Sequence, residues 1–323
     1  MYQQPELLLE QYDIEVKAIQ KGRGAFLVST NLGPLLLQEY RGSVERAQIL
    51  GEIWKTLKEL GYPAEQLYYS KEQEPVIQDE YEVSYILKDH IQGMECNPRS
   101  REEMKRAMEE IARFHQYSEA CLARLPLGWK LCHGELYEIR TRNTKELIKA
   151  RNYIRGKRKK NAFEELFQKR APYYLELARE NLKQLETESA EEIRPVLCHG
   201  ECNHHNVVHK MEQGQVTELM CLQYNYGTKD VVNFLRKMLE KNQWDIRLGQ
   251  ELLASYEKVR GLTPQERKRI YLELAYPEKF WKVTNHYMNT NKAWGMERDV
   301  EKLQKVIDQE PSRVAFLESF SRG

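Results

Sequence analysis

Short apolar runs bounded by turn residues fill the N-terminal part of the chain. These β-type runs are residues 26–30, 34–40, 74–78 and 82–87. Because Asn31-Leu32-Gly33 separates the first two runs, they are predicted to form a strand hairpin. Between the second and third runs, apolar residues recur at helical spacing after Ser43, a capping residue, until Gly61 and Pro63 end the helix. The helical positions are Val44, Ala47, Leu50, Trp54 and Leu57. The predicted order is therefore strand, strand, helix and further strands.

Helical periodicity dominates the rest of the chain. Capping boxes, in which two side chains satisfy free backbone groups at a helix start, are predicted at Ser100–Glu103 and Thr263–Glu266. The change of pattern lies near residues 88–98. We therefore predict an α+β protein with a small β-rich lobe over residues 1–88, made of strands and one helix, and a larger helical lobe over residues 89–323.

Composition narrows the class of protein. The chain has 323 residues with 41% hydrophobic content, which is enough for a sizeable core. Its 50 basic and 49 acidic residues balance, so a general affinity for nucleic acid is not expected. No apolar run approaches the roughly 20 residues that span a membrane, and the N-terminal residues lack the pattern of a secretion signal, so we expect synthesis in the cytoplasm. The six cysteines form no pair of CxxC motifs, so reduced thiols are expected.

Residues 196–208 form the polar segment with the clearest chemical pattern. Apolar residues flank a turn that carries a carboxylate, Glu201, and an amide five positions later, Asn206. Phosphoryl-transfer enzymes of the kinase type use this spacing. In them the carboxylate orients the acceptor hydroxyl and takes its proton, the amide holds a metal ion, and a second carboxylate after the next strand completes the metal site. The strand predicted over residues 217–224 has Gln223 near its end, at the place of that second carboxylate.

The segment resembles the HGDxxxxN motif of aminoglycoside phosphotransferases and related kinase-like proteins, with three substitutions at charged positions. Glu201 stands where that family has aspartate, and Gln223 stands at its principal metal-binding aspartate. Gln38, in the second β-type run, falls at the position of the phosphate-clamping lysine. The resemblance also implies that His199 holds the turn in shape. Because Mg²⁺ prefers anionic oxygen ligands and neither glutamine is charged, we predict poor or absent phosphotransfer from this degenerate catalytic loop, residues 196–226.

Over nearly its full length the chain resembles the CotS-type spore coat proteins, a branch of the same superfamily. The segments that carry this resemblance are residues 61–63, 85–93, 111–118, 229–236, 275–287 and 292–294. The resemblance implies a bilobal protein kinase-like fold and a metal site reduced to Asn206 and Gln223. The implied residues of a degenerate nucleotide cleft are Gln38, Gly22, Gly24, Asp89 and Ile91. It also implies synthesis in the mother cell and assembly into the spore coat beside other coat proteins.

Other features have more than one interpretation. Four of the eight histidines lie within residues 199–209 and suggest a transition-metal site, but their placement over a loop and a strand favours chance clustering. Asp230 is either a metal ligand or, more usually for such a position, a helix cap. The basic run 151–160 is interpreted as a solvated connector or protein contact rather than a nucleic-acid site. Gly22 and Gly24 either cover phosphates or form an ordinary hairpin turn.

Three functional hypotheses follow. The leading one is a spore coat pseudokinase that acts through protein–protein contacts and needs no cofactor. The alternative is an active or weakly active ATP-dependent small-molecule phosphotransferase, in which Glu201 is the base and Asn206 holds a single Mg²⁺. This arrangement is strained, since misplacing a catalytic group by about 1 Å can cost on the order of a hundredfold in rate. The third hypothesis keeps nucleotide binding as a conformational switch without chemistry.

Overall fold

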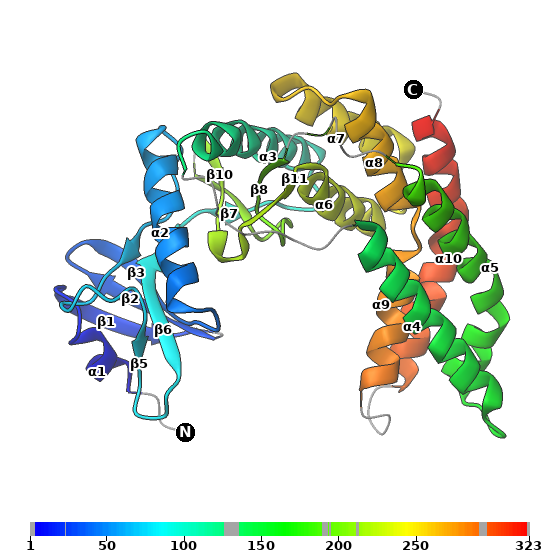
Figure 1. The fold of residues 1–323 in the computed structure, drawn as a ribbon, viewed down its shortest axis with the longest axis horizontal. Helices are drawn as coiled ribbons and strands as arrows, with labels where there is room; N and C mark the ends of the chain where they lie inside the picture. Colours follow the sequence, from blue (N-terminus) through cyan, green and yellow to red (C-terminus); the bar gives the residue numbers. More distant parts are fainter. Residues whose placement is uncertain are drawn as a thin grey trace.

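The computed structural model describes residues 4–22, 24–125, 136–188, 193, 195–210, 213–290 and 296–321. Residues 292–294, which carry part of the resemblance to coat proteins, lie outside the described residues. Within the described part, a β-rich N-terminal lobe is followed by a larger helical lobe (Figure 1). The predicted α+β fold class is confirmed.

The N-terminal lobe is a six-stranded antiparallel sheet with two helices. Its elements are α1 (Pro5–Leu9), β1 (Val16–Lys21), β2 (Ala25–Thr30), β3 (Gly33–Glu39), α2 (Val44–Glu59), β4 (Leu67–Tyr68), β5 (Ile77–Gln78) and β6 (Ser84–Asp89). The strand order is β1-β2-β3-β6-β4, and β5 also pairs with β6. The predicted hairpin is β2–β3, with Val28 opposite Leu35. The structure places β1 beside this hairpin and reduces the run predicted at 74–78 to β5.

The two faces of this sheet contribute to different cores. Val28 of β2 is fully buried in a core that includes residues of α1. Leu35 and Leu37 of β3 belong to the same core, as expected for alternate residues of one strand. Ile86 of β6 belongs instead to the core that contains Trp54 of α2. Gln38 is the partner of Ile86 in the sheet. Since directly opposite residues point to the same face, Gln38 lies on the α2 side.

The larger lobe is mostly helical and contains two small sheets. Its helices are α3 (Arg101–Leu122), α4 (Leu136–Gly156), α5 (Ala162–Glu186), α6 (Thr228–Lys241), α7 (Ile246–Val259), α8 (Pro264–Ala275), α9 (Glu278–Asn289) and α10 (Met296–Ser321). Its strands are β7 (Met94–Glu95), β8 (Pro195–Cys198), β9 (Val207–Lys210), β10 (Gln213–Val216) and β11 (Gln223–Tyr226). These strands form a three-stranded sheet, β10-β9-β7, and a two-stranded sheet, β11-β8. The strand predicted over residues 217–224 is wrong in its limits, because a 3₁₀ turn, Leu219–Cys221, separates β10 from β11.

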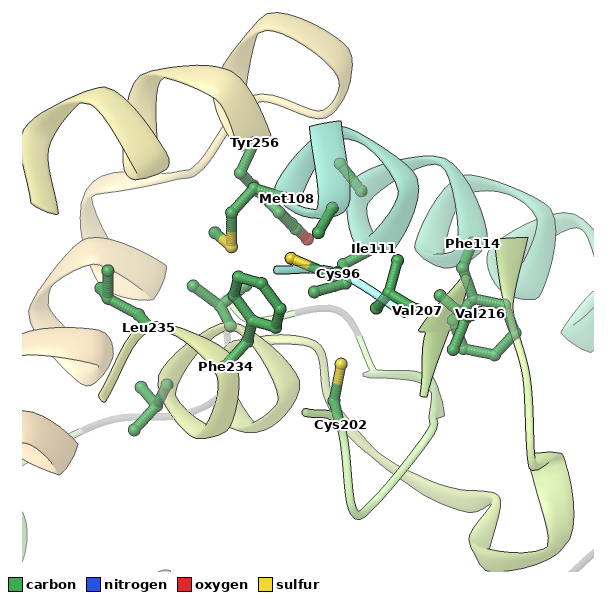
Figure 2. Close-up of a cluster of buried hydrophobic side chains, with 14 of the residues drawn as sticks. Cys96, Met108, Ile111, Phe114, Cys202, Val207, Val216, Phe234, Leu235 and Tyr256 are labelled. Carbon is green, nitrogen blue, oxygen red and sulfur yellow. The ribbon is translucent and has the colours of Figure 1, made fainter. Parts of the chain in front are cut away.

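The small sheets lie between the N-terminal lobe and the far helices (Figure 1). Apolar side chains from α3, α6, α7 and the small sheets form one core, shown in Figure 2, in which Cys202, Phe234 and Tyr256 are buried. Helices α4, α5, α9 and α10 form a second core at the end opposite the N-terminal lobe, with Phe163, Phe167 and Phe280 at its centre. The polar loop between β8 and β9 thus packs against the first core, to which it contributes Cys202.

No helix among the described residues is both long enough and apolar enough to cross a bilayer.

Candidate functional site

The polar loop predicted from residues 196–208 begins where β8 ends at Cys198 and continues to β9, which begins at Val207. In the two-stranded sheet, Gln223 is the partner of Cys198. This pairing brings the predicted metal position beside the start of the loop, although the two are far apart in sequence. The structure therefore gathers His199, Glu201 and Gln223 in one place.

Asp230, a fully buried residue in the first turn of α6, holds the loop on its core side. The backbone N–H groups of His199 and Gly200 donate to its two carboxylate oxygens at 2.6 and 3.0 Å. Nε2 of His115 lies 3.2 Å from one of these oxygens, and Nδ1 of the same ring lies 2.7 Å from the Tyr256 hydroxyl. Burial alone would raise the pKa of Asp230, but the hydrogen bonds from His115 and the His199 backbone outweigh it and hold the pKa below its ordinary value.

These contacts correct the interpretation of Asp230 as a helix cap. Helix α6 has Gly227 at its N-cap and no side-chain capping bond, and both Asp230 oxygens accept hydrogen bonds from the loop instead. Such a carboxylate, turned inward and fully buried, is a structural clamp for the loop and has no oxygen directed to a metal in solvent.

His199 shapes the loop from inside. Its Nε2 lies 2.8 Å from the carbonyl oxygen of Thr217, and its Nδ1 accepts from the backbone N–H of Glu201 at 3.2 Å. Since a carbonyl only accepts, the proton is on Nε2. Because both ring nitrogens already form hydrogen bonds within the protein, His199 positions the loop and has no free nitrogen to accept a proton from a substrate.

The Asn206 side chain reaches back across the turn to the backbone of Glu201. The Glu201 residue is exposed and Asn206 is half-buried. Nδ2 of Asn206 lies 3.3 Å from the backbone oxygen of Glu201, and the Asn206 N–H donates to the carbonyl of Asn203 at 3.0 Å. The spacing read from the sequence thus corresponds to one compact turn with a carboxylate at its exposed start.

The side chain of Gln223 forms a hydrogen bond that was not predicted from the sequence. Nζ of Lys229, in the first turn of α6, donates to Oε1 of Gln223 at 2.8 Å. Burial lowers the pKa of Lys229, and the neighbouring Cys198 and Asp230 act in the opposite direction. At the predicted metal position, this chain therefore has a neutral amide with an ammonium group bound to it. This amide and ammonium pair does not fit Mg²⁺, which prefers anionic oxygen ligands.

The residues of the predicted nucleotide cleft fall into two places. Gly22 and Gly24 lie in the turn between β1 and β2, and Gln38 is the sheet partner of Ala25 beside that turn. The Oε1 atom of Gln38 is buried with no hydrogen-bond partner among the described residues. Asp89, at the end of β6, binds the Tyr68 hydroxyl at 2.9 Å, together with Nζ of Lys58 and the backbone of Gln66. Its carboxylate is thus engaged within the N-terminal lobe. Ile91 follows, half-buried.

A buried lysine that the sequence analysis did not single out binds one acidic residue in each lobe. Nζ of Lys88, on β6, lies 2.9 Å from Oε1 of Glu65 and 2.8 Å from Oε2 of Glu218. The Lys88 side chain is 0% exposed and that of Glu65 is 1% exposed. Glu65 also accepts from the backbone N–H groups of Glu218 and Leu219. The available signal was a lysine directly after the apolar run Tyr85-Ile86-Leu87, on the same strand. A buried lysine needs an acidic partner.

Two further side chains reach the same segment, residues 216–222. The Val216 N–H donates to the hydroxyl of Tyr62 at 2.9 Å. Nη2 of Arg46, on α2, donates to the carbonyl of Leu222 at 3.0 Å. Together with Lys88, these residues fasten the N-terminal lobe to the strand connection that leads into Gln223.

The four histidines of residues 199–209 do not share a partner, and Nδ1 of His204 and Nε2 of His209 have no hydrogen-bond partner among the described residues. His205 contacts Glu95 through Nδ1, while His199 contacts Thr217 as described above. Within the described ranges, no group of three or more His, Cys, Asp or Glu side chains is arranged to hold a metal ion. The basic run 151–160 divides between the end of α4 and the connection to α5, where Lys157 pairs with Glu164.

Replacing Gly200 by alanine is expected to lower the free energy of unfolding by about 2–3 kcal/mol, as measured by urea denaturation. The residue has a φ of 86°, and a Cβ there would lie 2.5 Å from the backbone oxygen of Cys221. Gly24→Ala is the matched control: its φ is 74°, but a Cβ would meet nothing within 4 Å. Only the conformational cost, about 1 kcal/mol, is expected there. Equal losses in the two variants would contradict close packing at the loop.

The fold and the loop together define the class of protein: the chain has the fold of the aminoglycoside phosphotransferases. It resembles such an enzyme from Alicyclobacillus acidocaldarius with a TM-score of 0.85 and 16% identity, over 100% of this chain and 96% of the other. Spectinomycin phosphotransferase APH(9)-Ia, solved with ADP and spectinomycin, gives a TM-score of 0.67 and 13% identity, over 95% of this chain and 96% of that one. At these identities the likeness concerns the fold alone.

The particular family follows from the sequence. Residues 5–320 match the family described as "Spore coat putative kinase YutH", and the chain belongs to that family. "Spore coat protein S" of Bacillus subtilis (strain 168) is 25% identical over 313 residues, which cover 94% of this chain and 89% of that protein. The predicted resemblance to kinase-like spore coat proteins is thereby confirmed.

Proposed function

We propose that this protein is a spore coat component in which the kinase-like fold has lost phosphotransfer, a pseudokinase that acts through contacts with other coat proteins. Membership of the spore coat family supports the coat as its destination after synthesis in the mother cell. The near balance of 50 basic and 49 acidic residues supports protein partners over nucleic acid.

One contact gives the main support for the proposed loss of catalysis. Nζ of Lys229 donates a hydrogen bond to Oε1 of Gln223 at 2.8 Å. A metal ion on the same amide oxygen would lie about 4 Å from the ammonium, where two unit charges repel by about 4 kcal/mol at an effective dielectric constant near 20. A divalent ion doubles that repulsion. The neutral amide supplies little attraction to offset it, and Gln38 adds no positive charge to hold the phosphates.

The alternative is a weakly active ATP-dependent phosphotransferase with Glu201 as base and Asn206 as metal ligand. Because Glu201 is exposed, a substrate hydroxyl could reach its carboxylate. A nucleotide-driven switch receives less support, because Lys88, Tyr62 and Arg46 each bind residues 216–222 of the larger lobe.

The test is a thermal-shift titration of the purified protein with ATP, with and without Mg²⁺, followed by an ATPase assay. We expect no magnesium-dependent rise in Tm and no turnover. Magnesium-dependent stabilisation with turnover that Glu201→Ala abolishes would replace the proposal by the active enzyme. Stabilisation without turnover would favour the switch.

The double variant Gln223→Asp/Lys229→Met is the matched control for the proposed cause. It restores a carboxylate at the metal position and removes the ammonium while keeping a side chain of similar length. Stabilisation by Mg²⁺ and ATP that appears only in this variant would identify the lysine–glutamine pair as the obstacle to metal binding.

A further inference from the structure

A groove of about 560 Å³ lies beside the loop of the candidate site and is lined by α6, α9, α10 and two loop histidines. Its polar lining residues are His204, His205, Lys237, Glu240, Lys241, Lys279, Lys282, His286, Lys302, Lys305 and Gln309. The lining thus includes six lysines and three histidines but a single carboxylate. None of Gln38, Glu201 and Gln223 is among these residues, so the groove is separate from the degenerate metal position.

The six lysines come in three pairs, one on each helix. The pairs are Lys237 with Lys241 on α6, Lys279 with Lys282 on α9, and Lys302 with Lys305 on α10. Residues three or four apart lie on the same helix face. Each of the three helices therefore turns a doubly basic face to the same space.

The acidic residues nearby neutralise only part of this charge. Lys279 pairs with Glu240 at 3.0 Å and Lys302 with Asp299 at 3.0 Å. Lys282 lies 2.7 Å from Glu278, but that carboxylate is already shared with Arg140 and Arg236.

The remaining three lysines, Lys237, Lys241 and Lys305, form no ion pair within the part of the chain that the structure describes. Burial lowers the pKa of Lys237, and repulsion from Lys282 and Arg236 lowers it further. Neighbouring ammonium groups in the groove therefore act on one another. Charges held within a Debye length, about 8 Å at physiological salt, are not fully screened.

We propose that this lysine groove binds a small organic or inorganic polyanion, one that carries two or more phosphate or carboxylate groups. Its volume falls in the range of about 300–1,000 Å³ that is usual for small-molecule sites. Ammonium groups are donors only and match the acceptor oxygens of such anions. The site goes beyond the proposed structural function and does not depend on it.

The test is isothermal titration calorimetry of the full chain with tripolyphosphate and, separately, with citrate, so that phosphate and carboxylate sources are distinguished. We expect saturable binding of at least one of them that weakens as salt is raised from about 0.05 M to about 0.3 M. The groove variant is Lys241→Gln/Lys305→Gln, because both residues are exposed and neither forms an ion pair with a described residue. We expect it to bind about tenfold more weakly, because it loses two exposed ion pairs with the anion, each of which is weak on its own.

Lys17→Gln/Lys55→Gln is the matched control, since it removes two exposed charges from the N-terminal lobe. It is expected to bind as the unaltered protein does. No binding of either anion at the lower salt, or equal weakening in the groove and control variants, would overturn the proposal. Binding to an acidic peptide alone, with neither small anion bound, would also overturn it. The titrations contain no Mg²⁺ or ATP, so their result is independent of the test for phosphotransfer.

Discussion

Asp230→Ala is expected to lower the free energy of unfolding by about 3–5 kcal/mol, the loss typical when one partner of a buried charged network is removed. The carboxylate is 0% exposed and accepts from the backbone N–H groups of His199 and Gly200. Without it, the His199 N–H and the His115 ring stay buried without an acceptor, and the half-buried Gly200 N–H loses its partner as well. Urea denaturation followed by circular dichroism measures the effect.

Asp245→Ala is the control for Asp230→Ala, because Asp245 also accepts a backbone hydrogen bond but at the exposed N-cap of α7. Its loss is expected to cost about 1 kcal/mol. If the two variants lose similar stability, the buried clamp is not a principal support of the loop.

The pH dependence of the unfolding free energy of Asp230→Asn distinguishes the effect of the Asp230 charge from that of its side-chain shape. The folded pKa of Asp230 is lowered, so its contribution is fully present above the unfolded value, about 3.9, and is lost as pH falls through the folded pKa. The difference in unfolding free energy between the unaltered protein and Asp230→Asn is therefore expected to be constant above about pH 5 and to shrink below it. A difference that grows on acidification would contradict an ionised clamp.

Lys88→Met is expected to cost a similar amount, about 3–5 kcal/mol, because it leaves the carboxylate of Glu65 buried without its cation. Burial alone would lower the pKa of Lys88, but Glu65 and Glu218 outweigh it and raise the pKa, so the ammonium form persists. Glu218 is 42% exposed, and its share is discounted for solvent screening. Chemical denaturation measures the loss.

Two companion variants make the result for Lys88→Met interpretable. Adding Glu65→Gln should recover part of the stability, since the buried charge is removed as well. Lys58→Met removes an exposed partner of Asp89, and a loss of about 0–1 kcal/mol is expected. A loss in Lys88→Met no larger than in Lys58→Met would show that the buried pair does not stabilise the fold.

Local sequence signals predicted the elements that depend on local chemistry. The side chain of Ser43 caps α2 by accepting from the backbone of Arg46, and the capping box of Thr263 with Glu266 begins α8, as predicted. The capping box at Ser100 is only half formed. Ser100 does accept from the backbone of Glu103, but the carboxylate of Glu103 binds the N–H of Asn97.

Contacts between distant segments could not be derived in this way. The clamp joins Asp230 to His199, 31 residues earlier. Lys88 binds buried Glu65, 23 residues earlier, and half-exposed Glu218, 130 residues later. In both cases the residue type signals the need for a partner, but only the folded chain selects which one. The sequence analysis did not single out the lysine pairs of α6, α9 and α10, because their common groove depends on how those helices pack.

The candidate site shows the same division. The spacing from Glu201 to Asn206 predicted the turn, and Gln223 at an altered metal position remains a prediction from the resemblance. The approach of Lys229 to Gln223 was not predictable, because the lysine belongs to the next helix and its direction depends on how α6 meets β11.

The clamp behind the loop has an evolutionary consequence. Asp230, His115 and Tyr256 support the turn from within the core, on the side that no substrate would reach. Mutations on the solvent side, at positions such as Glu201, can therefore accumulate while the backbone of the turn stays in place. A lineage can abandon chemistry at this turn and still inherit an intact scaffold, open to a different use.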